Sequence, residues 1–300
     1  MAETEISGSG RFKPRILWFL RIGKEGAGGK MVLIGLGITA VLLLMTIMAP
    51  LVAPHDPFQG VVSCGPGHPC AIPPSTNNLM GTNHLGQDIF SRILFGGATM
   101  MEVAILSVAL CLVIGVPLGL LAGYLSGVGD KLLSLAMDSL YAFPGLVLAI
   151  AIAAVLGTGV LNLAVAISVV YIPSYFRVVR SQVLSVKELP FVEAVKVSGA
   201  KTAEILFRQI LPNVVPSIAV IASINVADAV LTEAGLTYLG LGPNVALPDW
   251  GWDIYYGKTL FFSGAWWAWT FPGLMIVLLA VGFTFIGEGL SEIWNPRLRR

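Results

Sequence analysis

The chain has 300 residues, of which 56% are hydrophobic and 12% are charged, and its formal net charge is +1. A soluble domain rarely exceeds about 45–50% apolar residues, so this composition is typical of a membrane protein. The near-neutral charge gives no field that would favour nucleic acid, and three cysteines are too few for a disulfide scaffold or an evident metal module.

Six apolar segments are each long enough to cross a bilayer. A hydrocarbon core of about 30 Å requires ~20 helical residues, and spanning segments must satisfy their own backbone hydrogen bonds. The runs lack the alternation of an outer-membrane barrel. The sequence therefore predicts an all-α integral membrane protein with six transmembrane helices, at residues 31–53, 98–123, 132–156, 160–180, 213–236 and 265–287.

Basic residues predict the orientation of these spans. With six spans both termini lie on one side, and 16 of the 18 Lys and Arg residues fall there, Arg92 and Lys258 being the exceptions. Because cytoplasmic loops carry an excess of Lys and Arg, the prediction is N-in and C-in. Residues 1–30 then form a basic cytoplasmic arm and residues 31–300 the transmembrane domain. The first span follows this arm and is too long for a cleaved signal.

Residues 54–97 are predicted to form an external loop that contains the turn CGPGHPC. Its two cysteines, Cys64 and Cys70, face an oxidising compartment and are candidates for a local disulfide. Free thiols are one alternative. A metal site that uses His68 with both cysteines is the other, although the motif alone does not supply a full ligand set.

Local patterns predict how helices begin, pack and meet the membrane surface. The stretch QDIFSRILFGG predicts a short amphipathic helix on the outer interface, capped by Asp88. Gly115, Gly119 and Gly123 form a ridge that favours close approach of another helix, although glycine is also common in membrane helices generally. An interfacial belt is predicted from five tryptophans: Trp250, Trp252, Trp266, Trp267 and Trp269.

Motifs for catalysis are absent from the sequence. GxSxG and HExxH do not occur, and KEGAGGKM departs from a P-loop at its first and last positions, so the chain is not expected to be an enzyme or to bind ATP. Asp138 and Asp228 lie deep in spans, where acids usually face a cavity or a partner, and Asn225 shares a helix face with Asp228. These three residues are candidates for a translocation pathway; a structural hydrogen bond inside the bundle is the alternative.

The segment EAVKVSGAKTAEILFRQILP, residues 193–212, is the longest polar stretch on the predicted inner face. It predicts two short helices, at 193–197 and 201–210, separated by Gly199, which tolerates a positive φ. Pro212 then opens the fifth span, where its missing N–H costs little. A short helix with a glycine corner suits a groove on another protein better than an ordinary solvated loop would.

This pattern resembles the EAA loop of ABC-transporter permeases, at Glu193, Ala194, Gly199, Leu211 and Pro212. Val195 stands where the family has alanine. GTNHLGQDIFSR resembles GTDxxGRDxxSR of C-type dipeptide and oligopeptide permeases, with Asn83 and Gln87 in place of the usual acid and arginine. The segments EAGLTYLGLGPNVALPDWG, AGYLSGVGD and NPRLRR are also similar to that family. The resemblance, to the C-type subunit of the dipeptide, oligopeptide and nickel family, covers about residues 30–300.

The resemblance implies the type I importer permease fold in the cytoplasmic membrane of a prokaryote. The chain would pair with a homologous B-type permease around one pathway, with two ATPase subunits beneath and an extracytoplasmic substrate-binding protein outside. ATP and Mg would be bound by the ATPases, and no cofactor by this chain. Residues 181–212 would be the coupling loop, with Glu193, Ala194 and Gly199 as its helix and corner and with Leu211 and Pro212 as its exit. Membrane lipid is an expected partner and nucleic acid is not.

Dipeptides or oligopeptides are the cargo that the resemblance implies. Nickel chelates, glutathione and oligosaccharides are alternatives in the same family. Three predicted external histidines, His55, His68 and His84, leave nickel open but are too few to favour it. A secondary transporter driven by an ion gradient is the alternative from another class, and the EAA-type loop between the fourth and fifth spans argues against it.

Overall fold

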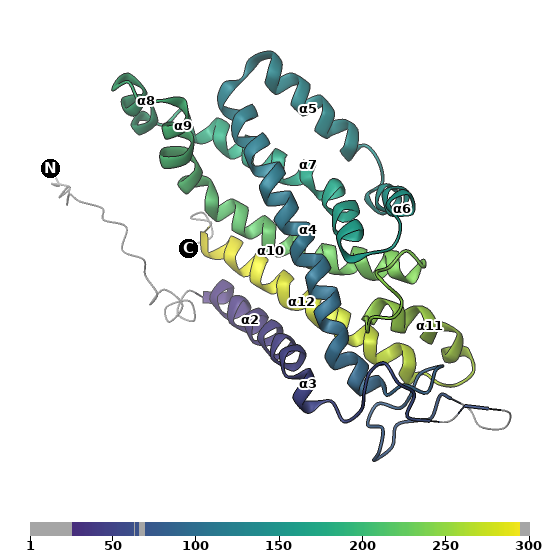
Figure 1. Cartoon of the computed structure of the whole chain (residues 1–300). Helices are drawn as coiled ribbons and strands as arrows, with labels where there is room; N and C mark the ends of the chain where they lie inside the picture. Colours follow the sequence, from purple (N-terminus) through teal and green to yellow (C-terminus); the bar gives the residue numbers. More distant parts are fainter. Residues whose placement is uncertain (1–25, 63, 66–69, 295–300) are drawn as a thin grey trace.

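The computed structural model describes residues 26–62, 64–65 and 70–294 (Figure 1). Most of the predicted basic arm, His68 and the NPRLRR ending lie outside the described residues. Five helical runs are long and apolar enough to cross a membrane, or six if a bent pair is one span. The prediction of an all-α membrane protein with about six spans is therefore confirmed.

The described part of the chain contains five long helical runs and five shorter helices. The long runs are α2 (Gly26–Ile47), α4 (Ile89–Leu125), α7 (Val160–Val186), α10 (Leu211–Tyr238) with α9 (Thr202–Glu204) and η2 (Ile205–Ile210) before it, and α12 (Trp267–Trp294). The shorter helices are α3 (Ala49–Val52), α5 (Gly127–Tyr141), α6 (Gly145–Leu156), α8 (Pro190–Val197) and α11 (Trp250–Phe262).

The two ends of the bundle carry different segments. In Figure 1 the start of α2, the end of α12 and α8 lie at one end, whereas residues 53–62, 70–88 and α11 lie at the other. This agrees with the predicted topology, in which both termini and the 181–212 loop share a face opposite to the loop after the first span. The ends are therefore called inner and outer below.

The predicted short outer helix is wrong as a separate element, because α4 is one helix of 37 residues. Asp88 caps it as expected, and the Ser91 N–H donates to Asp88 Oδ2 at 2.9 Å. The helix continues through Gly96 and Gly97, since Trp250 packs closely against both glycines. Three of the apolar side chains of the first two turns, those of Ile89, Ile93 and Leu94, are buried in the protein, and Phe90 is half-buried.

The third predicted span, 132–156, is not straight. α5 and α6 meet at an angle of 90°. Pro144 precedes α6 with ψ 121° and has no N–H to donate, so the chain cannot continue the helix of α5 through it. None of the residues of α5 is buried. Met137 packs against the core, and two ion pairs join α5 to α7, of which the shorter links Asp130 Oδ1 to Arg180 Nε at 2.5 Å.

The glycine ridge of α4 packs directly on α7, as predicted. A Cβ atom added to Gly119 would lie 2.8 Å from the carbonyl oxygen of Phe176 and 2.8 Å from Val179 Cβ. Gly115 and Gly123 have equally close neighbours on the same helix. A side chain at any of these positions would push the two helices apart, so the prediction of close packing is confirmed.

The predicted tryptophan belt is wrong for three of its five members. Trp250, Trp252 and Trp267 are buried, and their indole N–H groups donate to backbone carbonyls at 3.0, 3.0 and 3.2 Å. Only Trp266 and Trp269 are exposed, by 49% and 41%. The reason is α11, a helix absent from the sequence analysis, which folds back over the outer ends of the long helices.

Candidate coupling segment and pathway

The segment predicted to dock on a partner begins with a short helix at the inner end of the bundle. α8 starts at Pro190, whose fixed φ suits a first helical position. Glu193 and Ala194 are exposed, whereas Val192 is buried and Val195 packs against the core. The valine that replaces the family's alanine therefore faces the bundle, and the exposed face of α8 keeps the residues of the resembled pattern.

Gly199 turns the chain after α8 because of its backbone conformation and not for lack of space. Its φ is +84°, which side chains of L residues rarely adopt, and nothing lies within 4 Å of a Cβ added there. Its N–H donates to the carbonyl of Lys196 at 3.1 Å, which closes the end of the helix. The predicted glycine corner is thus present in the structure.

Pro212 lies in the first turn of α10, as predicted for the start of the fifth span, but no break in the helix precedes it. Residues Thr202–Tyr238 form one helical run of 37 residues. Just before the proline the run widens into η2, where the N–H of Leu211 donates to the carbonyl of Leu206, five residues earlier. This wider turn accommodates the missing N–H of Pro212 without ending the helix. The inner segment and the fifth span are consequently one continuous element.

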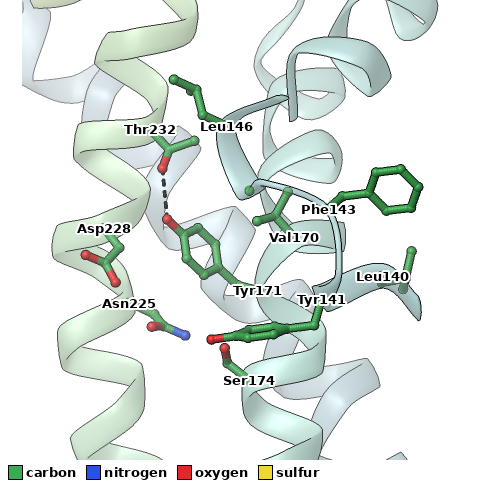
Figure 2. A pocket seen from close by; sticks show the side chains of 11 residues that line it. Leu140, Tyr141, Phe143, Leu146, Val170, Tyr171, Ser174, Asn225, Asp228 and Thr232 are labelled. Atoms are coloured by element: carbon green, nitrogen blue, oxygen red, sulfur yellow. Dashed lines mark hydrogen bonds between the residues drawn. The ribbon is translucent and has the colours of Figure 1, made fainter. Parts of the chain in front are cut away.

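A polar cavity lies farther along the same run, between α10 and the α5–α7 region (Figure 2). Its volume is about 360 Å³. Asn225 and Asp228 line it from α10, opposite Tyr141 and Tyr171. The Tyr171 hydroxyl is hydrogen-bonded to Thr232 Oγ1 at 2.8 Å and so links α7 to α10 across it. The structure thus brings together two of the three predicted pathway residues.

Asp138, the third predicted pathway residue, does not line this cavity. Its carboxylate pairs with Arg177 at 2.9 Å, and both side chains are exposed by more than half. The guanidinium of Arg177 lies 4.2 Å from the centre of the Tyr141 ring. Asp138 therefore lies beside the cavity, where its ion pair holds the residue that orients Tyr141.

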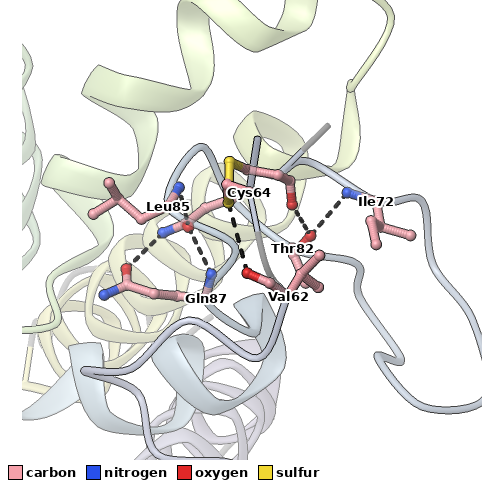
Figure 3. The surroundings of a disulfide bond; sticks show 8 residues. Val62, Cys64, Ile72, Thr82, Leu85 and Gln87 are labelled. Carbon is pink, nitrogen blue, oxygen red and sulfur yellow. Dashed lines mark hydrogen bonds between the residues drawn. A yellow bond between two sulfur atoms is a disulfide. The ribbon is translucent and has the colours of Figure 1, made fainter. Parts of the chain in front are cut away.

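The outer loop contains a disulfide between Cys64 and Cys70, whose Cα atoms are 5.0 Å apart (Figure 3). Thr82 anchors this part of the loop, since its hydroxyl donates to the Cys70 carbonyl at 2.5 Å and accepts from the Ile72 N–H at 2.8 Å. Within the described residues no group of three His, Cys, Asp or Glu side chains could hold a metal ion.

Two neutral amides take the places of the acid and arginine of the resembled family. The Asn83 amide donates to Gln87 Oε1 at 2.8 Å, and the same oxygen accepts from Arg92 Nη1 at 3.1 Å. A hydrogen bond between two neutral side chains therefore joins these positions in this chain.

Sequence reasoning missed a buried ion pair beneath this loop. Arg92 is 6% exposed, and its Nε lies 2.6 Å from Asp253 Oδ1 on α11. Burial raises the pKa of the Asp253 carboxyl, and the charge of Arg92 opposes that rise. Burial and the same arginine lower the pKa of His84. The isolated position of Arg92 on the predicted outer side was the one available signal.

These features define a class of protein. A bundle of five or six spans, with an exposed, glycine-cornered inner helix continuous with a span that lines a polar cavity, is the architecture of an ABC importer permease. Residues 115–300 match the family described as binding-protein-dependent transport system inner membrane component, and residues 29–64 match the N-terminal TM domain of oligopeptide transport permease C. The chain belongs to the first of these families.

Relatives and solved structures agree with that assignment. The chain is 36% identical over 284 residues to the dipeptide transport system permease protein of Alkalihalophilus pseudofirmus, covering 92% of this chain and 89% of the relative. It is 39% identical over 226 residues to the glutathione transport system permease protein of Pectobacterium atrosepticum, covering 75% of each. A chain of the inward-facing MetNI methionine ABC transporter shares the fold, with a TM-score of 0.55, 17% identity, and 68% and 97% coverage.

The chain is therefore a multi-pass inner membrane permease subunit of a bacterial ABC transporter. It is a transport subunit of the dipeptide, oligopeptide and glutathione group. Membership of a binding-protein-dependent system implies ATPase and binding-protein partners.

Proposed function

We propose that the chain imports dipeptides or oligopeptides as one half of a heterodimeric permease. A homologous B-type subunit would form the other half, two ATPases that bind ATP and Mg would dock beneath, and a substrate-binding protein would deliver cargo outside. The relatives that match most of the chain support peptide cargo, since several are named for dipeptide transport. The observation that carries the mechanism is the continuous helical run Thr202–Tyr238.

This run would couple ATP hydrolysis to the pathway. Glu193 and Ala194 present an exposed face to an ATPase, and the corner at Gly199 sets the angle between α8 and the run. When the ATPases close, a push on α8 would tilt the run as a rigid body. The tilt would carry Asn225 and Asp228 past the facing helices, and so open or close the cavity.

The cavity supplies a reason for peptide cargo. None of the ion pairs in the described part of the chain includes Asp228, which nevertheless lines the cavity. Intramembrane acids usually face a pathway or a partner. A peptide has a cationic amino terminus that this carboxylate suits, and the Asn225 amide and Tyr141 ring suit its backbone and side chains. A purely structural hydrogen bond of Asn225 in the bundle remains the competing role.

Glutathione is the second candidate cargo, because a glutathione permease is among the relatives. It is itself a tripeptide with a free amino group, so the same cavity chemistry would serve it. For nickel chelates the described residues offer no group able to hold the metal. Nothing in the cavity lining favours an oligosaccharide over a peptide.

Uptake into proteoliposomes that hold the complete complex tests the cargo. A labelled dipeptide should enter only when ATP is present with the ATPases, and unlabelled di- and tripeptides should compete with it. Glutathione, a nickel–histidine chelate and an oligosaccharide serve as matched competitors. Competition by the chelate or the oligosaccharide, with none by peptides, would overturn the peptide assignment, and uptake driven by an ion gradient without ATP would overturn the transport class.

A further inference from the structure

Three acidic side chains are buried together at the outer end of the bundle. Glu233 on α10 and Asp249 before α11 are both 0% exposed, and Asp253 on α11 is 7% exposed. Burying an unpaired carboxylate is costly, so each negative charge needs a cation, hydrogen-bond donors or a proton. The number of positive charges nearby decides which of these applies.

One arginine faces the three acids, and Asp253 occupies it. Arg92 Nε donates to Asp253 Oδ1 at 2.6 Å, while Nη1 is committed to Gln87 Oε1 and the Pro57 carbonyl. His84 also faces this pair, and burial together with the charge of Arg92 lowers the pKa of its ring, which favours the neutral form. Arg92 therefore balances one acid, and two buried carboxyls are left with no cation of their own.

These two carboxyls are neighbours with one unsatisfied oxygen each. Glu233 Oε1 accepts from the Thr237 hydroxyl at 2.9 Å, and Asp249 Oδ1 accepts from the Trp252 N–H at 3.0 Å. Their other oxygens, Glu233 Oε2 and Asp249 Oδ2, are buried without a donor. Thr237 brings the two carboxyls together, because its hydroxyl is bonded to Glu233 and a Cβ added to Gly251 would lie 2.7 Å from Thr237 Cβ and 3.1 Å from Asp249 Oδ1. Two ionised carboxylates have no hydrogen to place between them.

We propose that Glu233 and Asp249 share one proton, and thereby form a proton-binding site that joins the outer end of α10 to the start of α11. A single O–H between the carboxyls satisfies both orphaned oxygens and halves the charge of the pair. Two adjacent buried carboxyls cannot both be ionised, so the proton is retained where isolated acids would lose theirs. Burial, and the charge of Asp253, raise the pKa of Asp249 to about 7, while its hydrogen bonds to the backbone N–H groups of Trp252 and Gly251 and the positive charge of Arg92 oppose the rise.

A shared proton would also account for the close packing of the start of α11 against the outer end of α10. Asp249 caps α11 through the Trp252 N–H, and a Cβ added to Gly251 would lie 2.7 Å from Thr237 Cβ. The outer end of α10 is the far end of the run that begins at Thr202. A proton on the pair would therefore hold α11 to the outer end of the same helix whose inner end carries the coupling segment.

The stability that the shared proton contributes depends on pH, because the pKa of Asp249 is higher in the folded chain than in the unfolded one. The ordinary pKa of an Asp is 3.8, and in the folded chain Asp249 holds its proton up to about 7. The folded state then binds a proton that the unfolded state has lost. Its contribution to stability is complete below the ordinary value and is lost as the pH rises toward about 7.

The test compares the full chain in lipid nanodiscs with Asp249→Asn and Glu233→Gln. Each amide keeps the shape of the acid and donates a hydrogen to its neighbour at every pH. At a pH of about 6 the infrared C=O band of protonated carboxyls should be stronger in the wild type than in either variant, by the intensity of one carboxylic acid. The wild-type Tm should fall by several degrees between about pH 4 and pH 8 relative to both variants.

Asp88→Asn is the matched control, because Asp88 is also buried but accepts from three donors on Ser91 and Asn78. Asp88→Asn should lower the Tm, but its carboxylic C=O band and the fall of its Tm with rising pH should match those of the wild type. Two results would overturn the proposal: an infrared band unaffected by both Asp249→Asn and Glu233→Gln, or wild-type and variant Tm values that fall in parallel. Stabilisation by added Na⁺ or Ca²⁺ at about pH 8, absent in Asp249→Asn, would also overturn it and assign a cation to the pair.

Discussion

Two glycines of this chain are required for opposite physical reasons. Gly199 has open space around it but a φ of +84°, whereas Gly119 has helical backbone angles but no room for a side chain. The ridge that contains Gly119 was predictable from its four-residue spacing, and so was the cap at Asp88, because both signals are local. The contact between Glu233 and Asp249 was not predictable, since it depends on how the chain between them folds back.

A leucine at position 119 should separate α4 from α7. Overpacking a tight contact costs roughly 1–3 kcal/mol, so Gly119→Leu should lower the Tm and the yield of assembled complex. Gly37→Leu is the matched control, because that glycine is exposed on a spanning helix and has nothing within 4 Å of an added Cβ. Equal Tm values for the two variants would show that the ridge does not determine helix packing.

The bond between Cys64 and Cys70 is a prediction for the protein in its native compartment. A thiol reagent applied from outside should label neither cysteine before reduction and both after it, as counted by mass spectrometry. Cys111 is buried in the membrane-spanning part of α4 and provides the unlabelled reference. Equal labelling of the pair with and without reductant would mean that the thiols are free.

At the scale of elements, α5 differs from every long helix of the bundle. None of its residues is buried, and its two ion pairs to α7 supplement the contact that Met137 makes with the core. Hydropathy predicted an apolar segment here but not its bend, because periodicity is blind to a change of direction. Pro144 was the signal in the sequence for that break. Pro212 is the opposite case, because a wide helical turn tolerates this proline and the helix continues through it.

Removing the stronger of these ion pairs should loosen α5. Arg180 donates to both oxygens of Asp130, at 2.5 and 2.7 Å, and the pair is partly shielded from solvent. We expect Asp130→Asn to cost roughly 1 kcal/mol after allowance for screening. Asp138→Asn, in the more exposed pair with Arg177, should cost less. A double-mutant cycle with Arg180→Gln measures the coupling, and additive effects would refute the tether.

At the scale of the whole molecule, the order and sides of the segments were predictable because charge distribution and hydropathy both act over long stretches. The position of α11 over the outer ends of the long helices was not predictable, since a cluster of tryptophans looks the same in the sequence whether the side chains are buried or lie at the membrane interface. The structure shows that the helical run Thr202–Tyr238 begins beside α8, passes the polar cavity and ends near Glu233 and Asp249. A movement imposed at one end is therefore transmitted along one helix.

The coupling claim is tested most directly by ATP-driven uptake in proteoliposomes that hold the complete complex. Glu193→Lys and Gly199→Pro should abolish uptake while assembly with the ATPases is monitored by co-purification of the partners. Lys131→Glu, a charge reversal on the same face outside the coupling loop, is the control and should transport normally. Uptake at the wild-type rate in either coupling variant would contradict the account.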